Sequence, residues 1–245
     1  MHPYIEKRIK QNPYNPEILP MSTPVICFGD LYKSNVATLG LNPSDKEFVD
    51  DNKIFLEAGE LRFQNCFSLS QNDLTQLNAN QTELVLQYCL EYFNNENPYR
   101  VWFNKLEDYV LSNLDISYYN GTCCHLDLVQ WATSKKWRNV LPENQSILID
   151  SDYPFLLHQL ENQNIELLLV NGNGVYQALM NKGEIRHEKK DIIICGTETC
   201  RMNKFIINTG TKNIIGIAWS KNLQSSKGLT NIMRYEIGNW IKKNL

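Results

Sequence analysis

The pattern of apolar and polar positions is clearest around residues 36–44, where an apolar run, 36–41, ends in the polar turn Asn42-Pro43-Ser44. A run this short and β-prone predicts a buried strand. The turn would then lie at the carboxyl edge of a sheet, where open α/β sheets bind their ligands. Because a residue before proline favours an extended conformation, the Asn42 amide would point in a fixed direction and hold a water or a ligand atom. The alternative is an ordinary strand-ending turn.

Strands and helices are expected to alternate along the rest of the chain. A strand is expected within 117–129, and because polar and apolar residues alternate over 124–129, it would present His125 and Asp127 on one face. Further strands are expected at 165–170 and 213–218, and helices at 45–58, 82–93, 100–114, 152–163, 175–181 and 230–243. This order predicts a three-layer α/β/α fold around a central, mostly parallel, four-stranded sheet.

Three segments fit this pattern less well. Residues 1–24 contain five prolines and predict an extended N-terminal arm on the surface. Residues 24–30 form either a small edge strand or the wall of a loop. Residues 191–194 and 204–208 form either an antiparallel pair or an insertion packed on the sheet. No repeat or linker divides the chain, so residues 1–245 are expected to form one domain.

Composition limits the classes of function. The net charge of −3 gives no overall attraction to nucleic acid, although it leaves room for a local basic face. No apolar run approaches the ~18–20 residues of a membrane span. The seven cysteines lack zinc or iron–sulfur spacing, and residues 1–10 carry no apolar signal segment, which predicts free thiols, no metal and a cytoplasmic location. The glycine-rich turn 171–174 lacks a dinucleotide fingerprint and a P-loop lysine, so no cofactor is expected.

Four short segments occur in one order at or near the ends of the expected strands. They are Gly40-Leu41-Asn42-Pro43-Ser44, Cys66-Phe67-Ser68-Leu69, the strand around His125 and Asp127, and residues 219–223. Together they resemble the uracil-DNA glycosylase superfamily over residues 25–240, and the first two are closest to its motifs. The resemblance implies a uracil-DNA glycosylase-like fold and an enzyme that flips a nucleotide out of DNA and hydrolyses the bond between base and sugar.

The resemblance also assigns roles to individual residues. Asn42 would hold the attacking water, Phe67 would stack on the flipped base, and Asp127 would recognise the edge of the base. The other residues expected around the substrate are Gly40, Leu41, Pro43, Ser44 and Asn171.

The final motif of the superfamily carries a histidine that donates to the departing base, and residues 219–223 contain none. Ser220, Lys221 or Asn222 would have to replace it, or His125 would reach in from the neighbouring strand. Leu223 would be the wedge that fills the vacated base stack, or else a buried leucine that caps the last strand.

Two departures from the superfamily bear on the substrate. Uracil-specific members have a tyrosine after the motif proline that blocks pyrimidine C5, whereas this chain has Ser44, which leaves room. Those members recognise uracil with an asparagine, whereas Asp127 aligns here, and a carboxylate accepts from the exocyclic amine of cytosine. The expected activity is a monofunctional glycosylase that removes a 5-substituted cytosine, such as glucosylated hydroxymethylcytosine of phage DNA, and leaves an abasic site.

Two alternatives stay open. One is a repair glycosylase for uracil or another deaminated base, and the other is a catalytically silent binder of DNA or a nucleotide. DNA is the expected partner of the enzyme, with no membrane and no obligate protein partner. The basic residues Lys135, Lys136 and Arg138, interleaved with Trp131 and Trp137, either follow the DNA phosphates or form a solvated loop.

Overall fold

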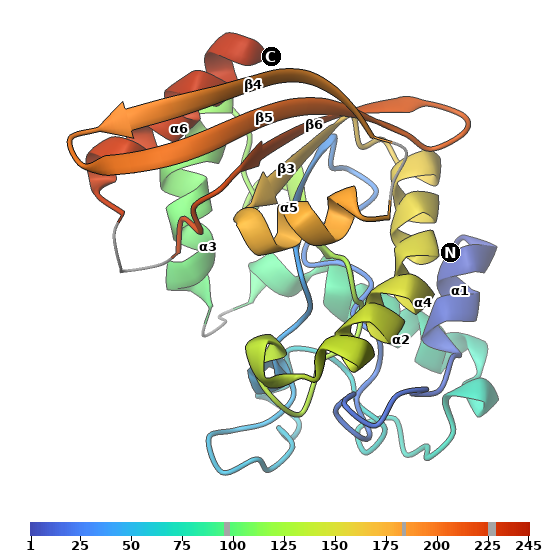
Figure 1. The fold of residues 1–245 in the computed structure, drawn as a ribbon. Coiled ribbons are helices and arrows are strands. Elements are labelled where there is room, and N and C mark those ends of the chain that lie inside the picture. Colours follow the sequence, from blue (N-terminus) through green and yellow to red (C-terminus); the bar gives the residue numbers. More distant parts are fainter. Residues whose placement is uncertain (96–98, 183–184, 225–228) are drawn as a thin grey trace.

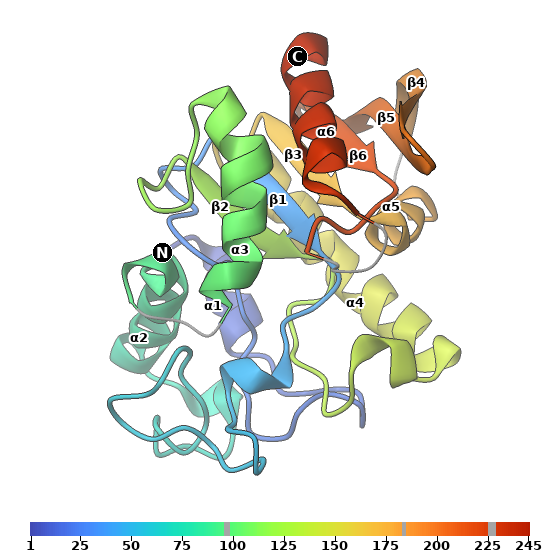
Figure 2. The ribbon, with the colours of Figure 1, turned by 90° about the vertical axis from the view of Figure 1, so that its left-hand side faces the viewer.

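One six-stranded mixed sheet, mostly parallel, runs through the computed structural model, which describes residues 1–95, 99–182, 185–224 and 229–245. The strand order is β2-β1-β3-β6-β5-β4, with β3 to β6 labelled in Figure 1 and all six strands in Figure 2. The parallel strands are β1 (Val36–Gly40), β2 (Cys123–Asp127), β3 (Leu167–Asn171) and β6 (Asn213–Trp219). These are the four strands expected from the apolar pattern, and their parallel pairing confirms the α/β class.

The expected number of strands was wrong, because β4 (Ile185–Cys195) and β5 (Glu198–Asn208) extend the sheet as an antiparallel hairpin. The pair expected from 191–194 and 204–208 is part of this longer hairpin. The hairpin turns at Gly196, whose φ of +60° lies in the left-handed region that favours glycine. Most side chains of β4 are exposed, so its polar sequence has no apolar face to reveal a strand.

Helices cover both faces of the sheet (Figures 1 and 2). Helices α3 (Arg100–Leu106) and α6 (Asn231–Asn244) lie on one face, and α4 (Pro142–Asn162) and α5 (Asn173–Met180) lie on the other. Every residue of β2 and β3 is buried between these layers. None of the helices in the described ranges is both long and apolar enough to cross a lipid bilayer.

The N-terminal segment is not the extended surface arm that its prolines suggested. Residues Pro3–Ile9 form helix α1, with proline in the first turn, where the missing N–H costs nothing. Ile5 and Ile9 lie one turn apart and are fully buried. Arg8 Nη2 lies 2.5 Å from Asp152 Oδ1 of α4, and both side chains are buried. The apolar face of this short helix therefore anchors the segment to the rest of the fold.

Residues 24–30 form the wall of a loop rather than a strand. A single bridge joins Phe28 to His125, with a 2.9 Å backbone hydrogen bond in each direction. The N–H of Val25 also donates to the carbonyl of Gln130 at 2.7 Å. The segment therefore runs along the open edge of β2 and holds the Phe28 ring beside that strand.

The helix expected at 45–58 is absent. A single 3₁₀ turn, Asp45–Glu47, is followed by an irregular loop. Within that loop Asp50 Oδ1 accepts from the backbone N–H groups of Asn52 and Ile54, at 2.8 and 2.9 Å, and such local bonds compete with helical ones. The other expected helices form with shifted ends, including α2 (Ala79–Leu90), while α3 continues as a π-helical turn, Glu107–Leu111.

Candidate active site

A pocket of about 540 Å³ opens at the carboxyl ends of β1 and β2. The polar side chains that line it include Asn42, Ser44, Glu47, His125 and Asp127. Its aromatic side chains are Phe28, Tyr99, Trp102, Phe103 and Trp137. Aromatic walls combined with convergent polar groups are typical of a small-molecule site. The fold thus brings together the first and third of the four segments singled out in the sequence.

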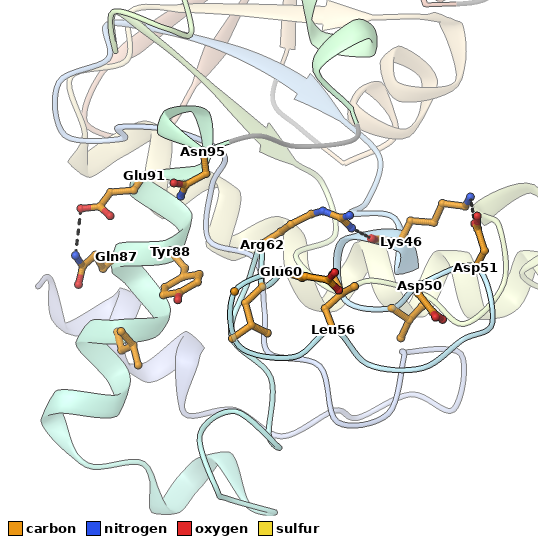
Figure 3. A pocket seen from close by; sticks show the side chains of 14 residues that line it. Lys46, Asp50, Asp51, Leu56, Glu60, Arg62, Gln87, Tyr88, Glu91 and Asn95 are labelled. Atoms are coloured by element: carbon orange, nitrogen blue, oxygen red, sulfur yellow. Dashed lines mark hydrogen bonds and ion pairs between the residues drawn. The ribbon is translucent and has the colours of Figure 1, made fainter.

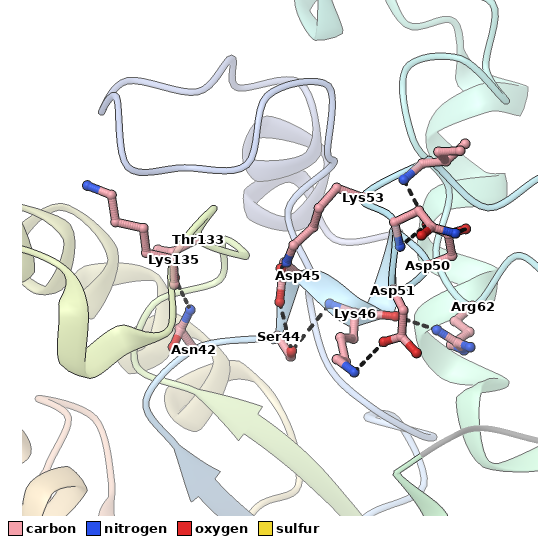
Figure 4. A network of polar contacts seen from close by, with 12 residues as sticks. Asn42, Ser44, Asp45, Lys46, Asp50, Asp51, Lys53, Arg62, Thr133 and Lys135 are labelled. Atoms are coloured by element: carbon pink, nitrogen blue, oxygen red, sulfur yellow. Dashed lines mark hydrogen bonds and ion pairs between the residues drawn. The ribbon is translucent and has the colours of Figure 1, made fainter.

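The Asn42 amide is held in one orientation by three acceptors. Its Nδ2 donates to Pro43 O at 2.9 Å, Thr133 Oγ1 at 3.1 Å and Trp131 O at 3.4 Å, and Figure 4 shows the contact with Thr133. A flipped amide would place Oδ1 against two carbonyl oxygens, so the orientation is well determined. Across the described ranges no donor reaches Oδ1. That oxygen can accept a hydrogen bond from a molecule in the pocket.

His125 is orientated by a chain of buried hydroxyl groups. Its Nδ1 lies 2.8 Å from Thr38 Oγ1, which lies 2.7 Å from Tyr118 Oη. The distances allow either direction along this chain, but Tyr118 Oη has no other hydrogen-bond partner among the described residues. Its buried O–H is satisfied only if the phenol donates to Thr38 and Thr38 donates to Nδ1, and we assign the directions on this ground. This tautomer leaves the proton on Nε2, the nitrogen that faces Asp127. His125 therefore presents a donor at the pocket.

Asp127 keeps unused acceptor capacity. Its Oδ1 lies 3.5 Å from His125 Nε2, which is long for a hydrogen bond, and its buried Oδ2 has no partner among the described residues. Gly40 pairs with Asp127 across the two strands, and a Cβ at Gly40 would collide with Asp127 Oδ1 and lie 2.9 Å from His125 Nε2. The glycine is therefore what allows both side chains to stand this close to β1.

Glu47 is a pocket residue that the sequence did not single out. It lies in the 3₁₀ turn after Ser44, and only 2% of the residue is exposed. Its Oε1 accepts from Tyr92 Oη at 2.8 Å, while Oε2 is buried without a partner among the described residues. Burial raises the pKa of Glu47 to about 8, with a smaller contribution from the negative charge of Asp127. The hydrogen bond from Tyr92 and the positive charge of Arg62 act in the opposite direction and lower this pKa. The only feature of the sequence that could have indicated Glu47 as a pocket residue is its acidic side chain, three positions after Asn42-Pro43-Ser44.

Phe28 is one of the aromatic side chains that line the pocket, whereas Phe67, the expected stacking residue, is not. The ring of Phe67 is 60% exposed, packs edge-on against Phe55 at 5.1 Å between centroids and does not line the pocket. The Phe28 ring lies 5.3 Å from the His125 ring and 4.8 Å from the Tyr92 ring. Because Phe28 precedes β1 in an irregular segment, no local periodicity marks it as a site residue.

The space beside Ser44 is partly filled by a tyrosine from another segment. Tyr99, just before α3, donates from Oη to Ser44 Oγ at 2.9 Å, and both residues line the pocket. Ser44 also caps the 3₁₀ turn by accepting from Lys46 N at 3.3 Å (Figure 4). The room expected from a small residue at position 44 is therefore narrowed by the Tyr99 side chain.

The residues expected at the ends of β3 and β6 do not line this pocket. Asn171 Oδ1 accepts from Trp219 Nε1 at 2.8 Å and from Leu223 N at 3.0 Å, and its Nδ2 donates to Gln224. Leu223 is fully buried, which agrees with the expectation of a buried leucine that caps the last strand and not with that of a wedge in the DNA. Three more expected residues lie outside the pocket: Ser220 Oγ accepts from Arg201 N, Asn222 Oδ1 accepts from Gln224 N, and Lys221 lies between them. Leu41 is half-buried against the core.

Basic residues line the rim of the pocket. Lys46 pairs with Asp51 at 2.6 Å and Lys135 with Glu17 at 3.2 Å. Lys136 lines the rim and is exposed, and within the described ranges it has no acidic partner. Arg138, two residues further on, is likewise exposed and unpaired there. The rim therefore carries uncompensated positive charge although the whole chain is acidic.

A second, larger pocket of about 1110 Å³ lies beside the first, between the 50–62 loop and α2 (Figure 3). Lys46 lines both pockets. Several polar groups in Figure 3 pair with one another: Lys46 pairs with Asp51, Arg62 donates to the Lys46 carbonyl, and Gln87 donates to Glu91 at 3.1 Å. None of its lining residues has a buried polar atom without a partner in the described part of the chain. The smaller pocket is therefore the better candidate site.

The site offers no ready place for a metal ion. Within the described ranges no three His, Cys, Asp or Glu side chains gather in an arrangement that could bind one. All seven cysteines are free thiols, and only Cys195 is not buried.

Comparison with models of known protein families and with curated proteins finds no match for this chain. The function therefore has to be inferred from the geometry of the pocket itself.

Proposed function

We propose that the protein is a DNA glycosylase with a uracil-DNA glycosylase-like fold, which hydrolyses the bond between a flipped pyrimidine and its sugar. The observation that carries this proposal is Asn42, whose amide is locked by three acceptors with Oδ1 left free at an aromatic pocket. In this mechanism Oδ1 orientates a water toward the sugar carbon, and the base lies against the aromatic side chains. The rim residue Lys136 and the nearby Arg138 would contact the DNA phosphates.

His125 is the group that would stabilise the departing base. Breaking the bond leaves negative charge on the base, so a donor aimed at a base oxygen lowers the barrier. In the tautomer assigned from the Tyr118–Thr38 chain, His125 carries its proton on Nε2, at the pocket. Ser220, Lys221 and Asn222, the other donors considered for this role, lie outside the pocket. The donor that the final motif lacks would thus come from β2.

Asp127 supports an amine-bearing base as the substrate. Its carboxylate has a free acceptor in the pocket, and cytosine offers an amino group where uracil offers a carbonyl oxygen. A 5-substituted cytosine of phage DNA, removed in a defence role, is therefore the best candidate. Asp127→Asn adds a donor at this position and should shift the ratio of uracil to cytosine-type excision by roughly tenfold in favour of uracil. An unchanged ratio would rule out this role for Asp127.

A uracil or deaminated-base repair glycosylase is the second candidate, and Tyr99 is the observation that favours it. Its hydroxyl contacts Ser44, so the pocket is narrower on this side than Ser44 alone allows. A smaller base would fit such a pocket without movement of Tyr99. Tyr99→Ala should then raise activity on a bulky base relative to uracil.

The deciding experiment uses three DNAs of one sequence that carry cytosine, uracil or a bulky 5-substituted cytosine at one position. Alkaline cleavage reveals abasic sites, and mass spectrometry identifies the released base. Release of the bulky base alone supports the modified-cytosine proposal, and release of uracil alone supports the repair enzyme. Tight binding without release from any DNA would make the protein a binder, and activity that survives Asn42→Ala would exclude this pocket.

A further inference from the structure

We propose that Glu47 acts as a neutral carboxylic acid that donates a hydrogen bond to the base, opposite in character to Asp127, which accepts one. The pocket would then bind a ligand that presents both a donor and an acceptor to it, as the cytosine-type bases do. This inference rests on the proposed function, and it assigns a specificity role to a residue outside the motifs that suggested that function.

The contacts of Glu47 leave one oxygen for a ligand. Oε1 is used by Tyr92, whose hydroxyl donates to it at 2.8 Å. Oε2 is buried, makes no hydrogen bond within the described ranges and belongs to a side chain that lines the pocket. A buried carboxyl oxygen without a partner is costly, so a group that satisfies it on binding gains the corresponding free energy. Asp127 Oδ2 is in the same situation in the same pocket.

The surroundings keep the Glu47 proton in place. Within the described residues no Lys, Arg or His nitrogen lies within ion-pair distance of its carboxyl group. Arg62 is the cation that lowers the pKa of Glu47, and its guanidinium donates to the Lys46 carbonyl rather than to the carboxyl group. The titratable groups that face Glu47 are Tyr92 after α2, Tyr99 before α3 and Asp127 on β2. Burial and Asp127 together raise the pKa of Glu47 to about 8, so the acid form dominates at neutral pH.

Binding provides a test that does not depend on excision. The probe is a short fluorescein-labelled single-stranded oligonucleotide with one 5-hydroxymethylcytosine, and an otherwise identical oligonucleotide with an abasic-site analogue reports binding to the backbone alone. Anisotropy titrations with the Asn42→Ala protein measure the affinity for both from about pH 6 to about pH 9. We expect the preference for the base-containing probe to fall by up to tenfold per pH unit above about pH 8, as Glu47 ionises.

Two substitutions in the Asn42→Ala background show whether Glu47 is responsible. Glu47→Gln keeps a donor that cannot ionise, so the preference should be weaker at neutral pH and no longer fall above pH 8. Tyr92→Phe removes the hydroxyl that stabilises the ionised form, so the fall should move to higher pH. A role limited to packing would leave the pH profile unchanged in both variants.

The outcomes separate this inference from the proposed function. A fall in preference that persists unchanged in Glu47→Gln, or no preference for the base-containing probe at any pH, overturns the role of Glu47. Absence of abasic product from all three DNAs with the wild-type protein overturns the glycosylase proposal. A pH-dependent preference together with no product would leave Glu47 as a binding residue in a protein that is not an enzyme.

Discussion

The two halves of the sheet's carboxyl edge differ in how their polar groups are used. At the ends of β1 and β2, Asn42, Glu47 and Asp127 each keep an oxygen without a partner in the described part of the chain. At the ends of β3 and β6, Asn171 makes hydrogen bonds through both its oxygen and its nitrogen. Unused hydrogen-bonding capacity inside a pocket is expected of a ligand site, whereas satisfied groups hold a turn together. Both halves carry similar asparagines, so residue type alone does not separate them.

The largest effect should come from replacing Asn42 with alanine. Asn42→Ala removes the oxygen that orientates the water and should lower the excision rate by roughly 100-fold, measured as abasic-site formation. Asn222→Ala, at an exposed position beside β6, is the matched control and should leave the rate unchanged. Equal losses in both would mean that the catalytic edge has been misassigned.

Asn171→Ala should act on stability instead. It leaves the buried Trp219 Nε1 and Leu223 N without acceptors, at roughly 1–3 kcal/mol for each. Thermal unfolding should therefore shift down by several degrees, while the activity per folded molecule stays close to that of the wild type. A loss of activity without a loss of stability would show that Asn171 belongs to the active site and does not only stabilise the turn.

A smaller effect concerns the dependence of stability on pH. The pKa of Glu47 is about 8 in the folded protein and near 4.5 when the group is exposed, so between these values the folded state holds a proton that the unfolded state has released. Stability therefore falls as pH rises through this window, by at most about 1.4 kcal/mol per unit from this group. The stability of Glu47→Gln relative to the wild type should therefore increase from pH 5 to pH 8, measured by thermal melts. The stability of Glu57→Gln, at an exposed position, should not change relative to the wild type over this range.

The smallest effect should be at the rim. Lys136→Ala removes an uncompensated charge beside the pocket and should weaken DNA binding a few-fold, with the slope of log K against log salt reduced by about one. Lys190→Ala removes the same charge from the exposed strand β4 and should change neither. Equal effects from the two lysines would show that binding depends on overall charge and not on the rim.

The sequence predicted the elements whose signals are local. The apolar runs of β1, β3 and β6 and the alternation around His125 gave the parallel sheet, and the turn after β1 gave Asn42 and Ser44. Helix α1 was missed because its prolines were treated only as helix breakers. Glu47, Phe28 and Tyr99 reach the pocket from irregular segments, and their position depends on tertiary contacts that no periodic pattern encodes.

The segment before β1 also affects the order in which the protein can fold. The backbone of Phe28 is hydrogen-bonded to His125 of β2. The side chains of Arg8 and Tyr14 contact Asp152, which lies more than a hundred residues later in the chain. During synthesis these early residues leave the ribosome long before their partners, and contacts of such sequence separation form slowly. The pocket wall formed by Phe28 can therefore be completed only after β2 has emerged, and nascent chains that stop before α4 lack the Asp152 partner of Arg8 and would expose Ile5 and Ile9 to solvent and to chaperones.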